Sequence, residues 1–404
     1  MRIKASGLKP LPRRFCIVFA FLPFYLGMTI LPIASSVMDN ILDFWLIFAL
    51  LLLIGNELKI GIRIDRFKVF CLLYFVVIIV STVINGGDFM RMIKIIACIM
   101  MIILLTDYAV ETEYSFFVSF LSKLTIAVTI LNIFSIIFFP GGFSITSQGR
   151  ALADRYLLGM DNRFCCTLFP GFCFVLLNDI RGFGRIKLNS WIEYGLLLFT
   201  FAYTKAIGSL LSVLVILPIL LIINTRFAKK IFHGLSYFIV QTVLAFLITF
   251  VRIFERMALI LGYFGKDVTL TSRTYIWNKA NYYIESHKVI GMGIESNEDV
   301  ISKFSLVHLH NQLLTIIYQT GYIGLVSFLA IAADIYYKLF KSRKELEAQV
   351  VALILFLLFI QLLTDTVDNV RNHLFWMMAI GANIEIIIEN NKAQKTIKQL
   401  NSLF

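Results

Sequence analysis

The sequence predicts an all-α polytopic membrane protein with about twelve transmembrane helices. Of its 404 residues, 59% are hydrophobic and only 15% are charged, whereas about a quarter of the residues in soluble domains are charged. Apolar runs of about 20 residues recur along the whole chain, and each is long enough to cross a hydrocarbon core of roughly 30 Å. Lysine and arginine concentrate in every second connecting segment apart from 108–115, which carries none, as the positive-inside rule requires.

The apolar runs define the predicted spans. The first follows a basic start, but it is long and lacks a small-residue cleavage site, so we expect a retained helix and not a signal peptide. The second predicted span is short, and barely one turn separates the seventh predicted span from the eighth. In chain order the predicted spans are 15–33, 41–56, 67–84, 92–107, 116–139, 163–178, 190–204, 206–223, 231–251, 310–337, 349–364 and 372–389.

The basic residues predict the orientation of these spans. With the N-terminus in the cytoplasm, most lysines and arginines fall on cytoplasmic segments, and an even number of spans returns the C-terminus to the same side. The net charge of +12 is therefore mainly a topology signal. Because the basic residues are spread over six separate segments, the charge does not predict nucleic-acid binding. We see no repeat or soluble second domain and expect one membrane domain over 1–404.

Two predicted outer segments, 140–162 and 252–309, interrupt the apolar pattern. The second is far longer than an ordinary connection, and loops of that length tend to be functional. Within it, Thr271 and Ser272 resemble a helix start, and apolar and aromatic residues that include Trp277 follow at helical spacing. We expect a short amphipathic helix on the outer membrane surface, and then a tight turn at Gly291-Met292-Gly293.

His310 is the sharpest candidate for chemistry. It lies at the outer end of the tenth predicted span, and an imidazole can act as a general base near neutral pH. An interfacial histidine bonded to water is the alternative reading. His308 precedes it in a His-Leu-His sequence, but no cluster of carboxylates or cysteines completes a metal site. We therefore expect His308 to be a loop histidine and the six cysteines to be buried apolar residues.

The outer cations form a second group of candidates. Lys205 interrupts an otherwise nearly uncharged stretch, and a cation within a membrane helix is costly. Several such groups that converge on one site would suit a pyrophosphate, which arginine binds through paired hydrogen bonds. Each could instead contact lipid headgroups. The candidates are Arg150, Arg155, Arg163, Lys205 and Arg273, and the sequence leaves open whether Asp365, Asp368, Asn369, Arg371 and His373 line the same cavity.

The motif around His310 resembles the signature of the O-antigen polymerase and ligase superfamily. His310-Asn311 is followed after nine residues by Gly321-x-x-Gly324. Upstream motifs are similar to those of the family as well. They are Ser272-Arg273-x-x-x-Trp277, Gly291-x-Gly293, Thr204-Lys205 and Gly159-x-x-Asn162. At the position of Thr204-Lys205, members of the family usually carry a serine and an arginine.

The resemblance implies a GT-C-like glycosyltransferase of the bacterial cytoplasmic membrane. A glycan on undecaprenyl pyrophosphate would be the donor, and a lipid-linked glycan the acceptor. Arg273 and Lys205, with Arg150 or Arg155, would hold the pyrophosphate, and His310 would deprotonate the acceptor hydroxyl. Asn311, Gly321, Gly324, Trp277 and Asn162 would support the site. The family needs no nucleotide sugar, cofactor or metal for this step.

The resemblance favours a polymerase of O-antigen, capsular or exopolysaccharide repeat units, which could work with a chain-length regulator and a repeat-unit flippase. A ligase that transfers the finished glycan to lipid A core or another envelope acceptor is the second hypothesis. A twelve-span transporter of lipid-linked sugars or other solutes is the alternative from a different class. The large outer loop and the absence of detectable repeated halves argue against it.

Overall fold

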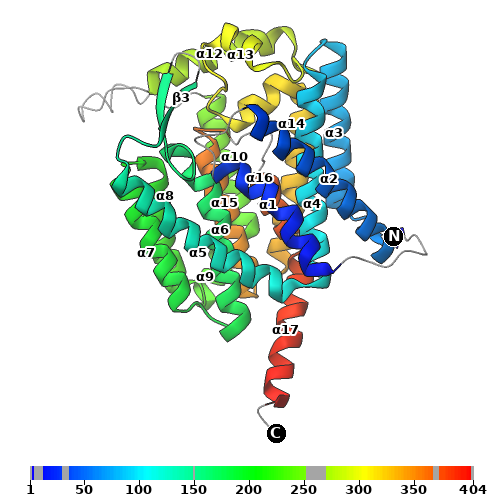
Figure 1. The fold of residues 1–404 in the computed structure, drawn as a ribbon, viewed down its shortest axis with the longest axis vertical. Helices are drawn as coiled ribbons and strands as arrows, with labels where there is room; N and C mark the ends of the chain where they lie inside the picture. The colour runs from blue at the N-terminus through cyan, green and yellow to red at the C-terminus, as the bar shows by residue number, and fades with distance from the viewer. Residues whose placement is uncertain are drawn as a thin grey trace.

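The computed structural model describes residues 2–3, 12–29, 36–148, 151–251, 270–366 and 373–401. These residues form an elongated bundle of α-helices with short segments of β-structure (Figure 1). The helices in the first half are α1 (Arg13–Thr29), α2 (Ser36–Ile60), α3 (Arg66–Ile84), α4 (Phe89–Thr112), α5 (Tyr114–Phe138), α6 (Phe164–Phe183), α7 (Leu188–Tyr203) and α8 (Ile207–Ile222).

The remaining helices follow in chain order. They are α9 (Arg226–Ile231), α10 (Gly234–Thr249), α12 (Leu270–Ser286), α13 (Asn297–Phe304), α14 (Gln312–Lys341), α15 (Leu346–Leu362), α16 (His373–Ala382) and α17 (Ile384–Asn401), with a short 3-10 helix η1 (Asp161–Arg163) before α6. Two antiparallel strand pairs complete the list, β1 (Arg2–Ile3) with β2 (Ile62–Arg63), and β3 (Ser144–Gln148) with β4 (Ala151–Arg155).

The prediction of an all-α polytopic membrane protein is confirmed. A helix stands at each of the twelve predicted spans. Six described helices are long and apolar enough to cross a membrane: α2, from Ile41 onward, and α3, α4, α5, α6 and α14. Four more apolar helices, α8, α10, α15 and α16, are shorter. The last predicted span is not one helix, because it divides at Asn383 into α16 and α17.

The core of the bundle is built from helices that are apolar all round. Helices α6, α15 and α16 bury nearly every side chain, and they lie inside the other helices (Figure 1). Helices such as α2, α3 and α8 instead expose large apolar side chains, among them Phe44, Leu72 and Leu211. Exposed apolar side chains of this number are unfavourable in water, so these faces belong against lipid.

One end of the bundle is tied by buried charges. The carboxylate of Asp107 contacts Lys68 Nζ and accepts a hydrogen bond of 2.5 Å from Asn383 Nδ2. Arg63 Nη2 donates to Asn383 Oδ1 at 2.5 Å and lies 3.8 Å from Asp107 Oδ1. The network joins the start of α3, the end of α4 and the break between α16 and α17. A buried charge without its partner would be strongly destabilising, so the network fixes how these elements meet.

The segments predicted to be cytoplasmic meet at this same end. Lys229 Nζ donates to Lys344 O at 3.0 Å, and Lys392 Nζ lies 2.7 Å from Glu345 Oε1. The segments predicted to be outer meet at the opposite end, where α12 and α13 lie near the N-terminal part of α14 (Figure 1). The grouping agrees with the predicted sidedness. That the α12 end faces away from the cytoplasm stays a prediction.

The outer segments contain more structure than the sequence indicates. The expected helix near Trp277 is present as α12, with Ile276, Trp277 and Ala280 buried and Tyr275 exposed. The side chains of Thr271 and Ser272, expected to cap it, lie outside the described part of the chain, as does 252–269. The hairpin of β3 and β4 and the helix α13 are not predicted.

Helix α14 is broken at Gly321, where φ is 65° and ψ is −168°. The sequence analysis predicts one continuous span there. The break frees the carbonyls of Tyr318 and Gln319, which accept hydrogen bonds from the backbone N–H groups of Met292 (2.7 Å) and Gly293 (2.9 Å). A Cβ at position 321 would lie 2.3 Å from Val289 O, so the break and the adjacent loop require glycine.

We predict that Gly321→Ala lowers the free energy of unfolding by about 3 kcal/mol or more, because alanine meets both the strained backbone and Val289. The apparent Tm of the purified protein in detergent measures this effect. Gly195→Ala in α7 is the control, because a Cβ there meets nothing within 4 Å. Equal Tm values for the two variants would show that the break does not depend on glycine.

Candidate active site

The backbone of His310 has an unusual conformation. Its φ is 53°, in the left-handed region, which costs a non-glycine residue on the order of 1–2 kcal/mol. The strained residue immediately precedes Asn311, the N-cap of α14. Strain of this kind persists only where the surrounding structure enforces it, and it is often found at functional sites.

Two buried hydrogen bonds hold the turn on either side of His310. Trp277 Nε1, on α12, donates to Leu309 O at 2.9 Å. Asn311 Nδ2 donates to Thr249 Oγ1 at the end of α10 at 3.1 Å, while Asn311 Oδ1 accepts from Leu314 N at 3.0 Å and caps α14. Three helices therefore fix the position of the His310 backbone. The supporting role predicted for Trp277 and Asn311 has a physical basis in these bonds.

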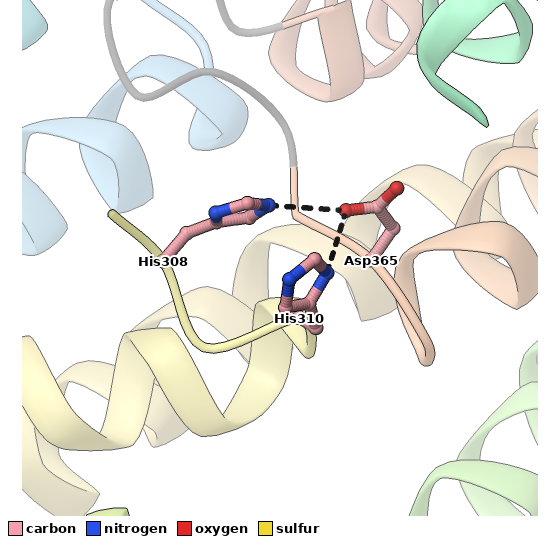
Figure 2. A group of neighbouring side chains, drawn as sticks. All are labelled: His308, His310 and Asp365. Carbon is pink, nitrogen blue, oxygen red and sulfur yellow. Dashed lines mark ion pairs between the residues drawn. The ribbon is translucent and has the colours of Figure 1, made fainter. Parts of the chain in front are cut away.

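A carboxylate distant in sequence faces the two histidines. Asp365 follows the end of α15, and its Oδ1 lies 3.6 Å from His308 Nε2 and 3.6 Å from His310 Nδ1. Figure 2 shows both imidazole rings turned toward this one oxygen. The ring centroids of the histidines are 4.0 Å apart. Thr366 N also donates to Asp365 Oδ1 at 2.8 Å, which orients the carboxylate.

The protonation states follow from burial and charge. Burial lowers the pKa of His308 to about 4, even though Asp365 opposes the shift, so His308 is neutral near pH 7. For Asp365, burial alone would raise the pKa. Contacts with His308 and His310 and the positive charge of Arg163 outweigh burial and hold the pKa well below its usual range. The carboxylate is therefore ionised.

Arg163 is the cation whose charge reaches this cluster. It lies in η1, directly before the buried helix α6, and its Nε atom is buried with no hydrogen-bond partner among the described residues. Arg163 is one of the outer cations predicted from the sequence, but it is not among the residues predicted to hold the pyrophosphate. A buried, unpaired guanidinium N–H beside the cluster makes Arg163 a stronger candidate for anion binding than the sequence indicates.

The predicted cations lie at the same end of the bundle as His310, and some are closer to it than others. Arg273 is one helical turn before Trp277 on α12, so it shares a face with the residue that contacts Leu309. Lys205 has a φ of 54° and lies two residues before the start of α8. On α8, Ser212 Oγ accepts a hydrogen bond of 2.6 Å from Nε2 of Gln361, which lies one helical turn before Asp365. Among the described residues, no hydrogen bond or ion pair joins Arg273 or Lys205 to His310.

The other predicted site residues lie in different surroundings, and some lie outside the described residues. Arg155 ends strand β4, where it pairs with Ser144. Arg150 and the side chain of Asn162 lie outside the described residues. Gly321 and Gly324 were expected to support the site. Gly321 packs against the backbone of Val289, and Gly324 faces the side chain of Thr320 in its own helix.

The fold also changes the expectation about a metal site. The sequence shows no carboxylate near His-Leu-His, but Asp365 supplies one from the end of α15. One ligand atom from each of His308, His310 and Asp365 lies within 4.8 Å of the others. The sequence does contain a signal that Asp365 could join the two histidines. Asp365 directly follows the eleventh predicted span, so it must lie at the same membrane face as His310.

Two comparisons relate this chain to known proteins. Residues 194–329 match the family model described as O-antigen ligase, a stretch that contains Lys205, Arg273 and His310. The exopolysaccharide production protein ExoQ of Rhizobium meliloti (strain 1021) is 33% identical over 81 residues, which cover 17% of this chain and 19% of that protein. The aligned part is thus about a fifth of the relative's length.

The two matches confirm the resemblance to the O-antigen polymerase and ligase superfamily that the histidine motif indicates. This superfamily is a class of enzymes in glycan biosynthesis. Together with the apolar helices, the matches support a multi-pass membrane protein.

We predict that Asn311→Ala loosens the turn that carries His310. The loss of the cap and of the bond to Thr249 should lower the free energy of unfolding by about 1–2 kcal/mol and raise deuterium uptake in a peptide that covers 305–311. Thr225→Ala, which removes the cap of the short helix α9, is the control and should leave that peptide unchanged. Unchanged uptake in Asn311→Ala would show that the turn is held by other contacts.

Proposed function

We propose that this protein is a membrane glycosyltransferase that polymerises oligosaccharide repeat units carried on undecaprenyl pyrophosphate. The observation that carries the proposal is the pair of His310 and Asp365, held in a strained turn at one end of a membrane bundle, with His310 inside the region that matches the O-antigen ligase family. The product would be an O-antigen, a capsule or an exopolysaccharide.

In this proposal His310 is the general base. Asp365 faces Nδ1, favours the tautomer with a proton on that nitrogen, and leaves the lone pair of Nε2 for the acceptor hydroxyl. The 3.6 Å separation in the free protein would shorten when the imidazole becomes charged, as is usual for catalytic contacts. Asp365 thus acts as a positioning residue that stabilises the imidazolium.

The reaction then balances without a cofactor. His310 Nε2 takes the proton of the acceptor hydroxyl as the oxygen attacks the anomeric carbon of the donor. The bond from that carbon to the pyrophosphate oxygen breaks on the opposite face, so the configuration inverts. Undecaprenyl pyrophosphate leaves with the electron pair, and Arg273, Lys205 and Arg163, with Arg150 or Arg155, stabilise its negative charge.

A groove next to the site suits the polyprenyl chain. It has a volume of about 180 Å³ and runs between α10, α14 and α15. Its lining includes Leu313, three residues after His310, and Leu363, two residues before Asp365, so the groove opens beside the proposed base. Phe246 and Phe250 on its rim are exposed and would face lipid acyl chains.

The proposed location is the outer face of the bacterial cytoplasmic membrane, with both termini in the cytoplasm. The distribution of lysine and arginine supports this orientation, because the basic segments meet at the end opposite His310. At that face nucleotide sugars are absent, so the energy of the reaction would come from the donor pyrophosphate bond. A chain-length regulator and a repeat-unit flippase would be the protein partners.

A ligase is the second candidate, because the matching family model is described by that activity. Both reactions use the same donor, and only the acceptor differs. A strain without this gene distinguishes them. It should accumulate a single repeat unit on the lipid carrier under the polymerase proposal, and long polymer on the carrier under the ligase proposal. Both matches concern glycan assembly, which favours these two classes over a transporter.

We predict that His310→Ala and His310→Asn both abolish chain extension, measured as polymer length on gels from a complemented deletion strain. Asparagine tolerates the left-handed backbone, so its failure would separate loss of the base from loss of the turn. His287→Ala changes another histidine at the same end and should keep activity. Normal polymer from His310→Asn would eliminate His310 as the base.

We predict that Arg273→Ala reduces the rate of chain extension by about 10²-fold or more, because it removes a donor to the leaving group. Arg273→Lys should recover only part of that rate, since lysine cannot form the paired hydrogen bonds of a guanidinium. Arg185→Ala, at an exposed arginine in the segment predicted to be cytoplasmic, is the control. Full activity of Arg273→Lys would show that charge alone is enough.

A further inference from the structure

His308, His310 and Asp365 present three ligand-type atoms to one small volume. Asp365 Oδ1 is 3.6 Å from His308 Nε2 and 3.6 Å from His310 Nδ1. These distances exceed the 2.7–2.9 Å or so expected for hydrogen bonds between a charged donor and a carboxylate. They are close to the separation of about 3.3–3.5 Å that two ligands adopt around one tetrahedral zinc ion, given zinc–ligand bonds of about 2.0–2.2 Å.

The ring nitrogens that face this volume are also unsatisfied. His308 Nε2 and His310 Nδ1 are buried and make no hydrogen bond among the described residues, and the same holds for His308 Nδ1. Buried polar atoms normally have a partner, because their desolvation is costly. Two such nitrogens are directed at one carboxylate oxygen, an arrangement that suits a shared cation (Figure 2).

The backbone around the three groups is already fixed, which reduces the entropy cost of binding an ion. Trp277 and Asn311 hold the residues on either side of His310, and Thr366 N orients the carboxylate of Asp365. A metal site needs such supporting bonds to its ligands.

We propose that His308, His310 and Asp365 form a binding site for a divalent transition-metal ion, with zinc the best fit. Two imidazoles and one carboxylate match the ligands of zinc sites and leave a fourth position open. Magnesium and calcium prefer oxygen ligands.

The bound ion would inhibit the enzyme, a consequence that rests on the proposed function. Zinc at Nδ1 of His310 takes the lone pair of that nitrogen, so the ring proton must lie on Nε2. A nitrogen that carries a proton cannot accept one from the acceptor hydroxyl. The same three groups would therefore form a catalytic pair when metal-free and an inactive site when metal-bound.

The test uses the full-length protein in detergent, first freed of metal with a chelator. Equilibrium dialysis against ZnCl₂ should give one bound zinc per chain, and CoCl₂ should give the visible absorption bands of a tetrahedral cobalt site. His308→Gln should weaken zinc binding at least about tenfold, since it removes a ligand. His287→Gln is the matched control and should bind as the wild type does. Added MgCl₂ should not compete.

A second measurement follows chain extension against zinc concentration, each variant being compared with its own rate without metal. Zinc should inhibit the wild type, excess chelator should restore its rate, and His308→Gln should need at least about tenfold more zinc. No zinc binding by the wild type, or binding that His308→Gln leaves intact, would overturn the metal site while His310 could still be the base. Binding without inhibition would overturn the regulatory consequence and the assignment of His310 as base.

Discussion

The contact between one carboxylate and two imidazoles organises the end of the bundle near α12. Asp365 belongs to the end of α15, and His308 and His310 belong to the segment before α14. A carboxylate that is largely removed from water is stable only when charged or polar partners surround it. The two rings, Arg163 and the N–H of Thr366 provide these partners, so α6, α14 and α15 must meet here. The same requirement produces a polarised imidazole.

The opposite end of the bundle uses the same physical principle for structure. Asp107 is surrounded by Lys68, Arg63 and Asn383, and these contacts join three elements far apart in the sequence. That network holds helices together. The carboxylate of Asp365 instead faces two imidazole rings, a residue type that can take up a proton near neutral pH or bind a metal ion.

Sequence reasoning succeeds where a single periodicity decides the structure. Apolar runs locate every predicted span, and the helix around Trp277 follows from its spacing. It fails where long-range contacts decide. The break of α14 depends on carbonyls of Tyr318 and Gln319 that bond to Met292 and Gly293, and the pattern of α14 alone does not contain that information.

The site shows the same division. His310 can be identified from its position at the start of a span, and the motif that it forms with Asn311 strengthens this identification. Asp365 lies 55 positions later in the numbering and becomes part of the site only when two helix ends meet, so the sequence could not decide its role. His308 was read as a loop histidine because its partner was not visible. Arg163 was named but not selected, since its proximity to Asp365 also depends on the fold.

The central claim is that His310 and Asp365 act as one unit in glycosyl transfer. A double-mutant cycle tests it most directly, with initial rates of chain extension measured for wild type, His310→Asn, Asp365→Asn and the double variant. Residues that act as a unit are not additive, so the double variant should be no slower than His310→Asn alone. Rate losses that multiply would contradict the account, because they would show that each residue contributes independently.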